Sequence, residues 1–287
     1  FGEKIVLRYL DSSALQVDMA KLGLDPDTLE VLKKIVHSPH GIFLVTGPTG
    51  SGKTTTLYSV LKELNTEKVN IATVEDPVEL TLTGVNQVQV KEHIGLSFSS
   101  ALRSFLRQDP DIILVGEVRD AETAQIAVKA ALTGHLVLST LHTNDAPSTV
   151  NRLMNLGVEG FMLASALRGI MAQRLVRTLC PDCKKKTSVD RGLLDKIEAA
   201  SQEGAEVFEP VGCSKCHQSG YKGRTGVYEC LHVTPDMQRL IEKQAGLPHI
   251  RKQALEAGMQ TLRQSAMNKL IQGVTSVEEV LRLTVDE

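Results

Sequence analysis

The chain has 287 residues, of which 42% are apolar, and this is enough for one large domain with smaller appendages and a filled core. A formal net charge of −2, aromatic residues at only 3% and the lack of tryptophan argue against a protein that binds nucleic acid directly, because such proteins rely on basic surfaces and stacking rings. No apolar run approaches the roughly 18 residues that a membrane span requires.

The first residues are interpreted as the end of a preceding domain. Residues 5–10 have the apolar pattern of a strand, and the chain begins at Phe1 rather than at methionine. We therefore expect residues 1–12 to be the last strand of a truncated N-terminal domain. A helix should then run from Pro26 to about Val36, because Asp25 offers an N-cap and proline is common at the first helical position.

Short apolar runs alternate with helical patterns through the next part of the chain. The predicted strands are 41–46, 70–74, 85–90, 112–115 and 136–140, and the predicted helices start near Lys53 and occupy 97–108, 121–133, 146–156 and 160–173. This alternation predicts a mostly parallel sheet that is wrapped by helices.

Residues 47–54 (GPTGSGKT) match the P-loop pattern completely, and they stand between a predicted strand and a predicted helix, as that motif requires. Glycines let successive backbone N–H groups converge on phosphate oxygens, and the helix directs its positive N-terminal end at the same anion. Lys53 supplies a charge for the β- and γ-phosphates, and the Thr54 hydroxyl supplies a ligand for Mg²⁺. The predicted nucleotide-binding residues are Gly47, Pro48, Thr49, Gly50, Ser51, Gly52, Lys53, Thr54 and Thr55.

Two carboxylates follow predicted strands, and we expect them to act on the water that attacks ATP. Glu117 ends the segment 111–117, although Gly116 stands where the usual pattern has aspartate, so a direct magnesium ligand from this strand stays an open question. Glu75 follows the second strand and is placed to accept a proton from that water. The carboxyl ends of parallel strands form the crevice in which α/β sheets bind ligands.

Two histidines flank the last strand of this series. His135 precedes the strand and His142 follows it. From spacing alone they either sense the γ-phosphate and bridge the carboxylates, or they are satisfied structural residues, which is the commoner case near a strand end.

Four segments together resemble one known family. The segments GPTGSGKTTTLY, VEDPVE, RQDPDIILVGEVRD and LTGHLVLSTLHTN resemble, in this order, the Walker A, aspartate-box, Walker B and histidine-box motifs of the type II/type IV secretion ATPase superfamily. The resemblance covers residues 1 to about 235 and implies a RecA-like core that works as a homohexameric ring, with ATP held between subdomains. A glycine before the Walker B glutamate is also found in that family, so Gly116 does not count against activity.

The resemblance also implies roles for single residues. Glu75 and Glu117 would be the hydrolytic carboxylates, and His135 and His142 would both be functional. Arg8 aligns with an arginine that reaches the nucleotide in such rings, and a guanidinium suits the charge that builds on a transferred phosphoryl group. The alternative for Arg8 is a solvated strand residue.

Two CxxC pairs separated by 29 residues contain four of the five cysteines. The four are Cys180, Cys183, Cys213 and Cys216. The spacing suits a closed, structural Zn²⁺ site, and the alternative is a pair of disulfides. Zinc is favoured because a P-loop ATPase needs ATP from the reducing cytosol. The resemblance implies in addition that such a module marks assembly-type members of the family, whereas retraction-type members generally lack it.

The predicted fold class is α/β, with three parts after the first strand. They are a RecA-like P-loop NTPase core at 13–178, a four-cysteine zinc module at 179–229 and a C-terminal helical subdomain at 230–287, whose last helix starts with a capping box at Ser276–Glu279.

The predicted function is a motor ATPase, using ATP, Mg²⁺ and structural Zn²⁺, that drives assembly of a type IV pilus or a type II secretion pseudopilus. We expect it in the cytoplasm, held at the bacterial inner membrane by a platform protein of that system. The alternatives are a DNA-uptake or DNA-transfer ATPase on the same core, and a non-hydrolysing scaffold. The acidic balance argues against the first, and the set of Lys53, Thr54, Glu75 and Glu117 argues against the second.

Overall fold

The structure is a computed structural model that describes residues 2, 3, 5, 18–187 and 206–284. Arg8 and all but one residue of the strand predicted at 5–10 lie outside this range. Within it, no helix has both the length and the apolar character to cross a membrane.

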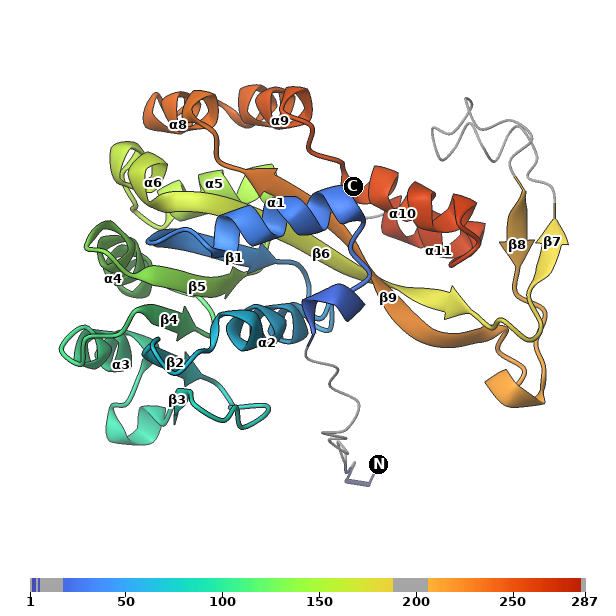
Figure 1. Ribbon diagram of the computed structural model, residues 1–287, viewed down its shortest axis with the longest axis horizontal. Helices are drawn as coiled ribbons and strands as arrows, with labels where there is room; N and C mark the ends of the chain where they lie inside the picture. The colour runs from blue at the N-terminus through green and yellow to red at the C-terminus, as the bar shows by residue number, and fades with distance from the viewer. Residues whose placement is uncertain (1, 4, 6–17, 188–205, 285–287) are drawn as a thin grey trace.

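The centre of the described part is a sheet of seven strands in the order β3-β2-β4-β5-β1-β6-β9 (Figure 1). The strands are β1 (Gly41–Thr46), β2 (Ile71–Glu75), β3 (Asn86–Gln89), β4 (Ile112–Val115), β5 (Leu136–Leu141), β6 (Leu167–Leu179) and β9 (Tyr221–His232). Neighbouring strands are parallel except β6 and β9, which are antiparallel. The mostly parallel α/β sheet predicted from the alternating pattern is confirmed.

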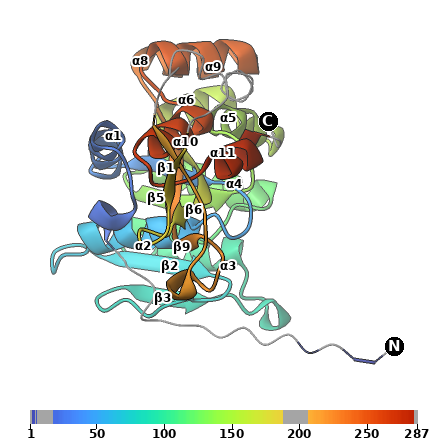
Figure 2. The ribbon, with the colours of Figure 1, turned by 90° about the vertical axis from the view of Figure 1, so that its right-hand side faces the viewer.

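Helices cover both faces of the sheet. The helices of the described residues are α1 (Pro26–Val36), α2 (Lys53–Leu64), α3 (Phe98–Phe105), α4 (Ala121–Leu132), α5 (Ala146–Asn155), α6 (Gly160–Ala166), α8 (Pro235–Glu242), α9 (Leu247–Glu256), α10 (Leu262–Ile271) and α11 (Val277–Thr284), with short 3₁₀ turns η2 (Met19–Lys21), η3 (Glu92–Ile94) and η5 (Ser214–Cys216). Of these, α8 and α9 pack mainly on α6 and α5. Figure 2 shows α1 and α2 on one side of the strands and α3 and α4 on the other. Each side buries its own apolar cluster, so the sheet lies between two cores.

Helix starts follow the expected capping chemistry. The Asp25 carboxylate accepts the Thr28 N–H at 2.9 Å, and Pro26 takes the first helical position, which confirms the predicted start of α1. The predicted capping box of α11 is only half formed. The Ser276 hydroxyl accepts the Glu279 N–H at 3.4 Å, but the fully buried Glu279 carboxylate accepts the Arg177 backbone N–H instead.

The helix predicted at 160–173 is wrong in its second half. It ends at Ala166, and β6 begins at Leu167. A short apolar run fits a buried strand as well as a helix, and here pairing with β1 and β9 decides the outcome. At Gly169, a side chain would collide with Ile35 of α1, so the glycine allows the helix to approach β6 closely.

Strand β9 was also missed, and the boundary that we drew between 229 and 230 falls inside it. The long β6–β9 pair leaves the core and leads to the cysteines. A two-stranded hairpin, β7 (Lys185–Thr187) with β8 (Val207–Glu209), stands beyond its end, at the right of Figure 1. Lys184 ties this hairpin to the loop before α11, because its ammonium donates to the Gly273 carbonyl at 2.7 Å.

Candidate nucleotide site and four-cysteine site

The predicted P-loop joins the carboxyl end of β1 to the first residue of α2. Gly47, Gly50 and Gly52 have φ angles of 145°, 79° and 90°, which other residues adopt only with strain. A side chain at Gly47 would also collide with the backbone of β6. The glycines therefore let the loop turn tightly against that strand, with Lys53 at the N-terminus of the helix.

The Lys53 ammonium lies over the loop. It donates to the carbonyls of Gly47 at 2.8 Å and of Pro48 at 3.2 Å. Burial lowers the pKa of Lys53, while the negative charge of Glu117 acts in the opposite direction. The structure thus brings the predicted phosphate-binding lysine within electrostatic reach of the predicted Walker B carboxylate.

Four ionisable side chains lie together just after the ends of three strands. Asp76 follows β2, Glu117 and Arg119 follow β4, and His142 follows β5. Arg119 forms an ion pair with Glu117, and its second nitrogen lies 3.8 Å from Asp76. The other oxygen of Glu117 lies 3.5 Å from Nε2 of His142. These two contacts fix the direction of the Glu117 carboxylate, and its side chain is still 17% exposed.

Glu75 also lies at this edge, but its carboxylate is buried beneath α2, against Tyr58. It is 4% exposed and accepts hydrogen bonds from the Tyr58 hydroxyl, from Thr73 Oγ1 and, at 3.1 Å, from Gln87 Nε2. Burial and the neighbouring Glu75 charge raise the pKa of Tyr58, so this phenol stays a donor. Both oxygens of Glu75 are therefore committed to partners, unlike those of a carboxylate that is free to bind water.

His135 lies at the opposite edge of the sheet. It precedes β5, and its Nδ1 lies 2.9 Å from the Ala130 carbonyl at the end of α4. Because β5 has six residues at ~3.3 Å each, His135 is roughly 20 Å from His142. The sequence analysis proposed the same role for both histidines. Within one chain, however, only His142 of the two lies on the P-loop side of the sheet.

Two residues at the P-loop side were missed by the motif analysis. Thr46 is the last residue of β1. Its hydroxyl lies 2.7 Å from the Thr143 hydroxyl and also accepts the Thr143 N–H at 2.8 Å. This pair joins the strand before the P-loop to the segment that carries His142. Thr143 stands inside the histidine-box segment and Thr46 ends the strand before the P-loop, but nothing in their spacing signals the contact.

A cavity of about 330 Å³ adjoins the outer side of the P-loop. Its lining comes from the P-loop, β6, β9 and α11, namely Pro48, Thr49, Gly50, Ser51, Arg174, Leu175, Arg177, Arg224, Arg282 and Leu283. The arginines are oriented by partners such as Glu279, which pairs with Arg177 at 2.9 Å and with Arg282 at 3.0 Å. Since β6 and β9 were not recognised as strands, this cavity could not be predicted from the sequence.

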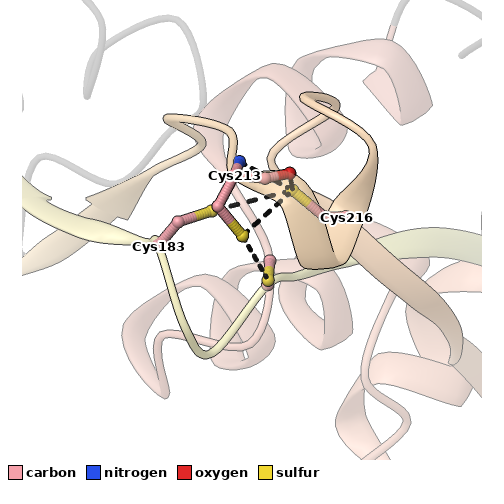
Figure 3. Close-up of side chains that lie close together, drawn as sticks. Cys183, Cys213 and Cys216 are labelled. Atoms are coloured by element: carbon pink, nitrogen blue, oxygen red, sulfur yellow. Dashed lines mark hydrogen bonds between the residues drawn. The ribbon is translucent and has the colours of Figure 1, made fainter.

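The four predicted cysteine ligands converge in the structure, and Figure 3 shows Cys183, Cys213 and Cys216 of this set. Their sulfur atoms all lie within 4.8 Å of one another. Three of the sulfur–sulfur distances are 3.9, 3.8 and 3.7 Å, close to the edge of about 3.8 Å in a tetrahedron with Zn–S bonds of about 2.3 Å. A disulfide would need about 2.05 Å, so the geometry fits Zn²⁺ and not two disulfides.

The surroundings favour the thiolate at one of the four ligands, Cys216, whereas burial raises the pKa of Cys183 to about 11. Burial alone would raise the pKa of Cys216, but backbone N–H groups of Cys213 and Gly220 donate to its sulfur, and its pKa is lowered to about 6. Beside the site, Lys215 and Asp182 form an ion pair that joins the two CxxC turns. Four protein ligands leave no open position, so a metal here would be structural.

Comparison with known proteins agrees with the predicted resemblance. The family described as "Type II/IV secretion system protein" matches residues 1–282. The chain is 52% identical over 290 residues to the "Type IV pilus assembly ATPase PilB" of Myxococcus xanthus, covering 100% of the chain and 51% of that protein. It is 47% identical over 283 residues to the "Type II secretion system ATPase E" of Vibrio cholerae, covering 99% and 56%. The chain thus spans about half the length of the curated relatives that it matches.

Solved structures agree on the fold. The "Pilus Retraction Motor PilT and Bound ADP" has a TM-score of 0.69 at 32% identity, over 93% of this chain and 66% of that one. The ATPase DotB of Legionella pneumophila has a TM-score of 0.68 at 22% identity, over 94% and 66%, and shares the fold. With these matches over nearly its whole length, the chain belongs to the type II/IV secretion system protein family.

Proposed function

We propose that this chain carries the hydrolytic site of a motor ATPase that drives assembly of a type IV pilus or a type II secretion pseudopilus. The observation that carries the proposal is the convergence of Lys53, Glu117 and His142 beside a complete P-loop at one edge of the sheet. Phosphoryl transfer needs positioning and charge stabilisation rather than covalent chemistry, and these side chains supply both.

The P-loop fits a nucleotide phosphate. The N-terminus of α2 begins at Lys53 and directs its unpaired N–H groups into the loop. Ser51 Oγ is buried without a hydrogen-bond partner among the described residues, and a phosphate oxygen would provide one. Thr54, in the first turn of α2, would hold Mg²⁺, which supplies charge neutralisation at the phosphates. The arginine-lined cavity next to the loop offers room for the rest of the nucleotide.

Glu117 is the carboxylate best placed to orient the attacking water. Arg119 holds one of its oxygens, and His142 lies 3.5 Å from the other, which fixes the direction of the carboxylate while leaving it partly exposed. Glu75 then stabilises the site indirectly, because its buried carboxylate accepts hydrogen bonds from Tyr58 and Thr73. Arg8 stays a proposal from the family resemblance, as the arginine that would stabilise the transferred phosphoryl group.

Assembly is preferred to retraction on two grounds. Relatives about 50% identical are named as pilus assembly and type II secretion ATPases, whereas the retraction motor PilT is 32% identical. The four-cysteine geometry matches the zinc module that the family resemblance assigns to assembly-type members. We propose further that the full protein works as a homohexamer on the cytoplasmic face of the inner membrane, bound to a platform protein.

The test is ATP turnover by the full-length protein, with Lys53→Ala and Glu117→Gln compared with the wild type. Loss of the Glu117 carboxylate should lower kcat by about 10²–10⁴-fold with ATP binding retained, because only the general acid–base function is removed. Lys53→Ala should lose ATP binding as well. Glu63→Gln is the matched control. Because Glu63 is exposed on α2, this variant should hydrolyse ATP at the wild-type rate.

Two results would contradict the proposal. Wild-type turnover at background in the hexameric, zinc-loaded protein would point to a non-hydrolysing scaffold. Turnover that rises strongly with added DNA would favour the DNA-transfer alternative.

A further inference from the structure

Strand β6 passes directly behind the P-loop, and one polar residue of the strand fills the space between them. Gln173 is 2% exposed and pairs with Tyr228 in the β6–β9 register. A side chain at Gly52 would come within 2.8 Å of the Gln173 amide nitrogen, and a side chain at Gly47 would collide with the Gln173 carbonyl. Gln173 therefore touches the loop near both of its ends.

The Gln173 amide makes two hydrogen bonds that fix its orientation. Its Oε1 accepts from the Thr56 hydroxyl at 2.7 Å, and its Nε2 donates to the Ser51 carbonyl at 2.8 Å. Thr56 is fully buried in the first turns of α2. Because the threonine hydroxyl donates to the oxygen end of the amide, the nitrogen end faces the P-loop.

The bond to Ser51 sets the direction of the next backbone N–H. In a planar trans peptide, the C=O and N–H groups point in opposite directions. Since the Ser51 carbonyl points back at Gln173, the Gly52 N–H points away from β6, toward the concave side of the loop. That N–H is one of the groups that a P-loop offers to phosphate.

We propose that Gln173 is a positioning residue of the nucleotide site, which holds the 51–52 peptide of the P-loop from behind, with Thr56 orienting its amide. This inference rests on the proposed function, because it presumes that the loop binds the phosphates of a nucleoside triphosphate. An apolar side chain of equal size would fill the same space but would leave the buried Ser51 carbonyl without its donor. The orientation of the 51–52 peptide would then no longer be fixed, although the side-chain packing behind the loop would be kept.

The experiment measures ATP affinity by calorimetry, together with KM and kcat, on the full-length protein. Gln173→Met keeps the volume and removes both hydrogen bonds. It should weaken ATP binding about tenfold, or ~1.4 kcal/mol, with KM rising in step and kcat falling less than about threefold. Ile170→Val is the control, since Ile170 is a buried residue of the same strand that packs away from the loop.

A pair of variants at Thr56 separates positioning from packing. Thr56→Val keeps the shape and removes the hydroxyl, so it should reproduce most of the loss in affinity. Thr56→Ser keeps the hydroxyl and should stay within about twofold of the wild type.

The possible outcomes separate this inference from the proposed function. Wild-type affinity in Gln173→Met, or equal losses in both Thr56 variants, would overturn the positioning role while leaving the ATPase intact. A wild type that binds ATP without hydrolysing it would overturn the motor and leave the positioning role testable by affinity. A full-length wild type that binds no nucleotide would overturn both.

Discussion

The nucleotide edge and the arm of this molecule are built in different ways. The nucleotide edge consists of residues 47–55, 75–76, 117–119 and 142–143, which follow the carboxyl ends of β1, β2, β4 and β5. The arm consists of residues 167–187 and 206–232, namely β6, β9 and the four-cysteine site. In the nucleotide edge, each chemical group stands inside a short sequence motif. In the arm, most contacts join residues far apart in the chain.

The two regions meet where β6 passes the P-loop. Arg177 of the arm lines the cavity next to the P-loop, stacks on Tyr221 at 3.9 Å and pairs with Glu279 of α11. The nucleotide edge therefore depends on the arm for one wall of its cavity. We infer that changes at Lys53 and Glu117 act first on turnover, whereas changes at the four cysteines and at Glu229 act first on stability.

The largest stability effect is expected from the four cysteines. Structural zinc contributes about 10–16 kcal/mol of apparent binding energy in zinc-finger peptides, so its loss should strongly destabilise the arm. Cys183→Ser should abolish the binding of one Zn²⁺ per chain, measured by elemental analysis, and lower the unfolding midpoint. Cys230→Ser is the control, because Cys230 is buried on β9 outside the cluster and should keep the metal. Full zinc content in Cys183→Ser would disprove the assignment.

The next effect concerns a buried carboxylate of the arm. Glu229 is 4% exposed and accepts the Ala146 N–H at 2.7 Å at the start of α5. Burial, with a smaller contribution from Asp145, raises its pKa to about 7, while Arg251 opposes the shift. The folded state thus binds the Glu229 proton more tightly than the unfolded state. The contribution of this proton to stability is complete below about pH 4.5 and is lost as the pH rises through 7.

Replacing Glu229 by glutamine should remove this pH dependence. Glutamine keeps an acceptor for the Ala146 N–H and cannot ionise, so the variant should be more stable than the wild type by about 3 kcal/mol at pH 8 and nearly equal to it at pH 4. Denaturant unfolding at both pH values measures the difference. Glu256→Gln, an exposed change of equal charge on α9, should show no such gain. Equal stability at pH 8 would mean that Glu229 is not held above its usual pKa.

Apart from the four cysteines, which their CxxC spacing identified, the sequence predicted the nucleotide edge better than the arm for a physical reason. A P-loop, or a carboxylate after a buried strand, is specified by adjacent residues, and parallel strands bring their carboxyl ends to one edge. The strand β6 is specified by partners on β1 and β9, and its residues 167–173 also fit a helix. Without β6 as a strand, neither Gln173 nor the arginine-lined cavity could be foreseen.

Side-chain direction was the second limit on prediction. The motif spacing placed His135 and His142 at the two ends of one strand, but it did not show that these ends lie at opposite edges relative to the P-loop. It also placed Glu75 correctly at a strand end without showing that Tyr58, Thr73 and Gln87 occupy its oxygens. Whether Glu75 or Glu117 is the more exposed carboxylate depends on contacts with residues distant in the chain, and no local sequence pattern specifies those contacts.

The smallest effect tests this difference between the two carboxylates. Glu75→Gln replaces one charged acceptor oxygen by an NH₂ group, and the donors from Tyr58, Thr73 and Gln87 lose a charged partner. We expect the free energy of unfolding to fall by ~1–2 kcal/mol, because hydrogen bonds to a charged group are stronger than neutral ones. Turnover per folded molecule should fall far less than in Glu117→Gln.

Denaturant unfolding and active-site-normalised kcat decide between the two roles of Glu75. Glu79→Gln removes an exposed carboxylate from the same segment and serves as the control for charge. If Glu75→Gln abolishes turnover at unchanged stability, Glu75 acts on water directly, as the family resemblance implied, and its buried pose must open during the reaction. If stability falls while turnover persists, Glu117 alone orients the water, and Glu75 is the buried acceptor that holds β2 against α2.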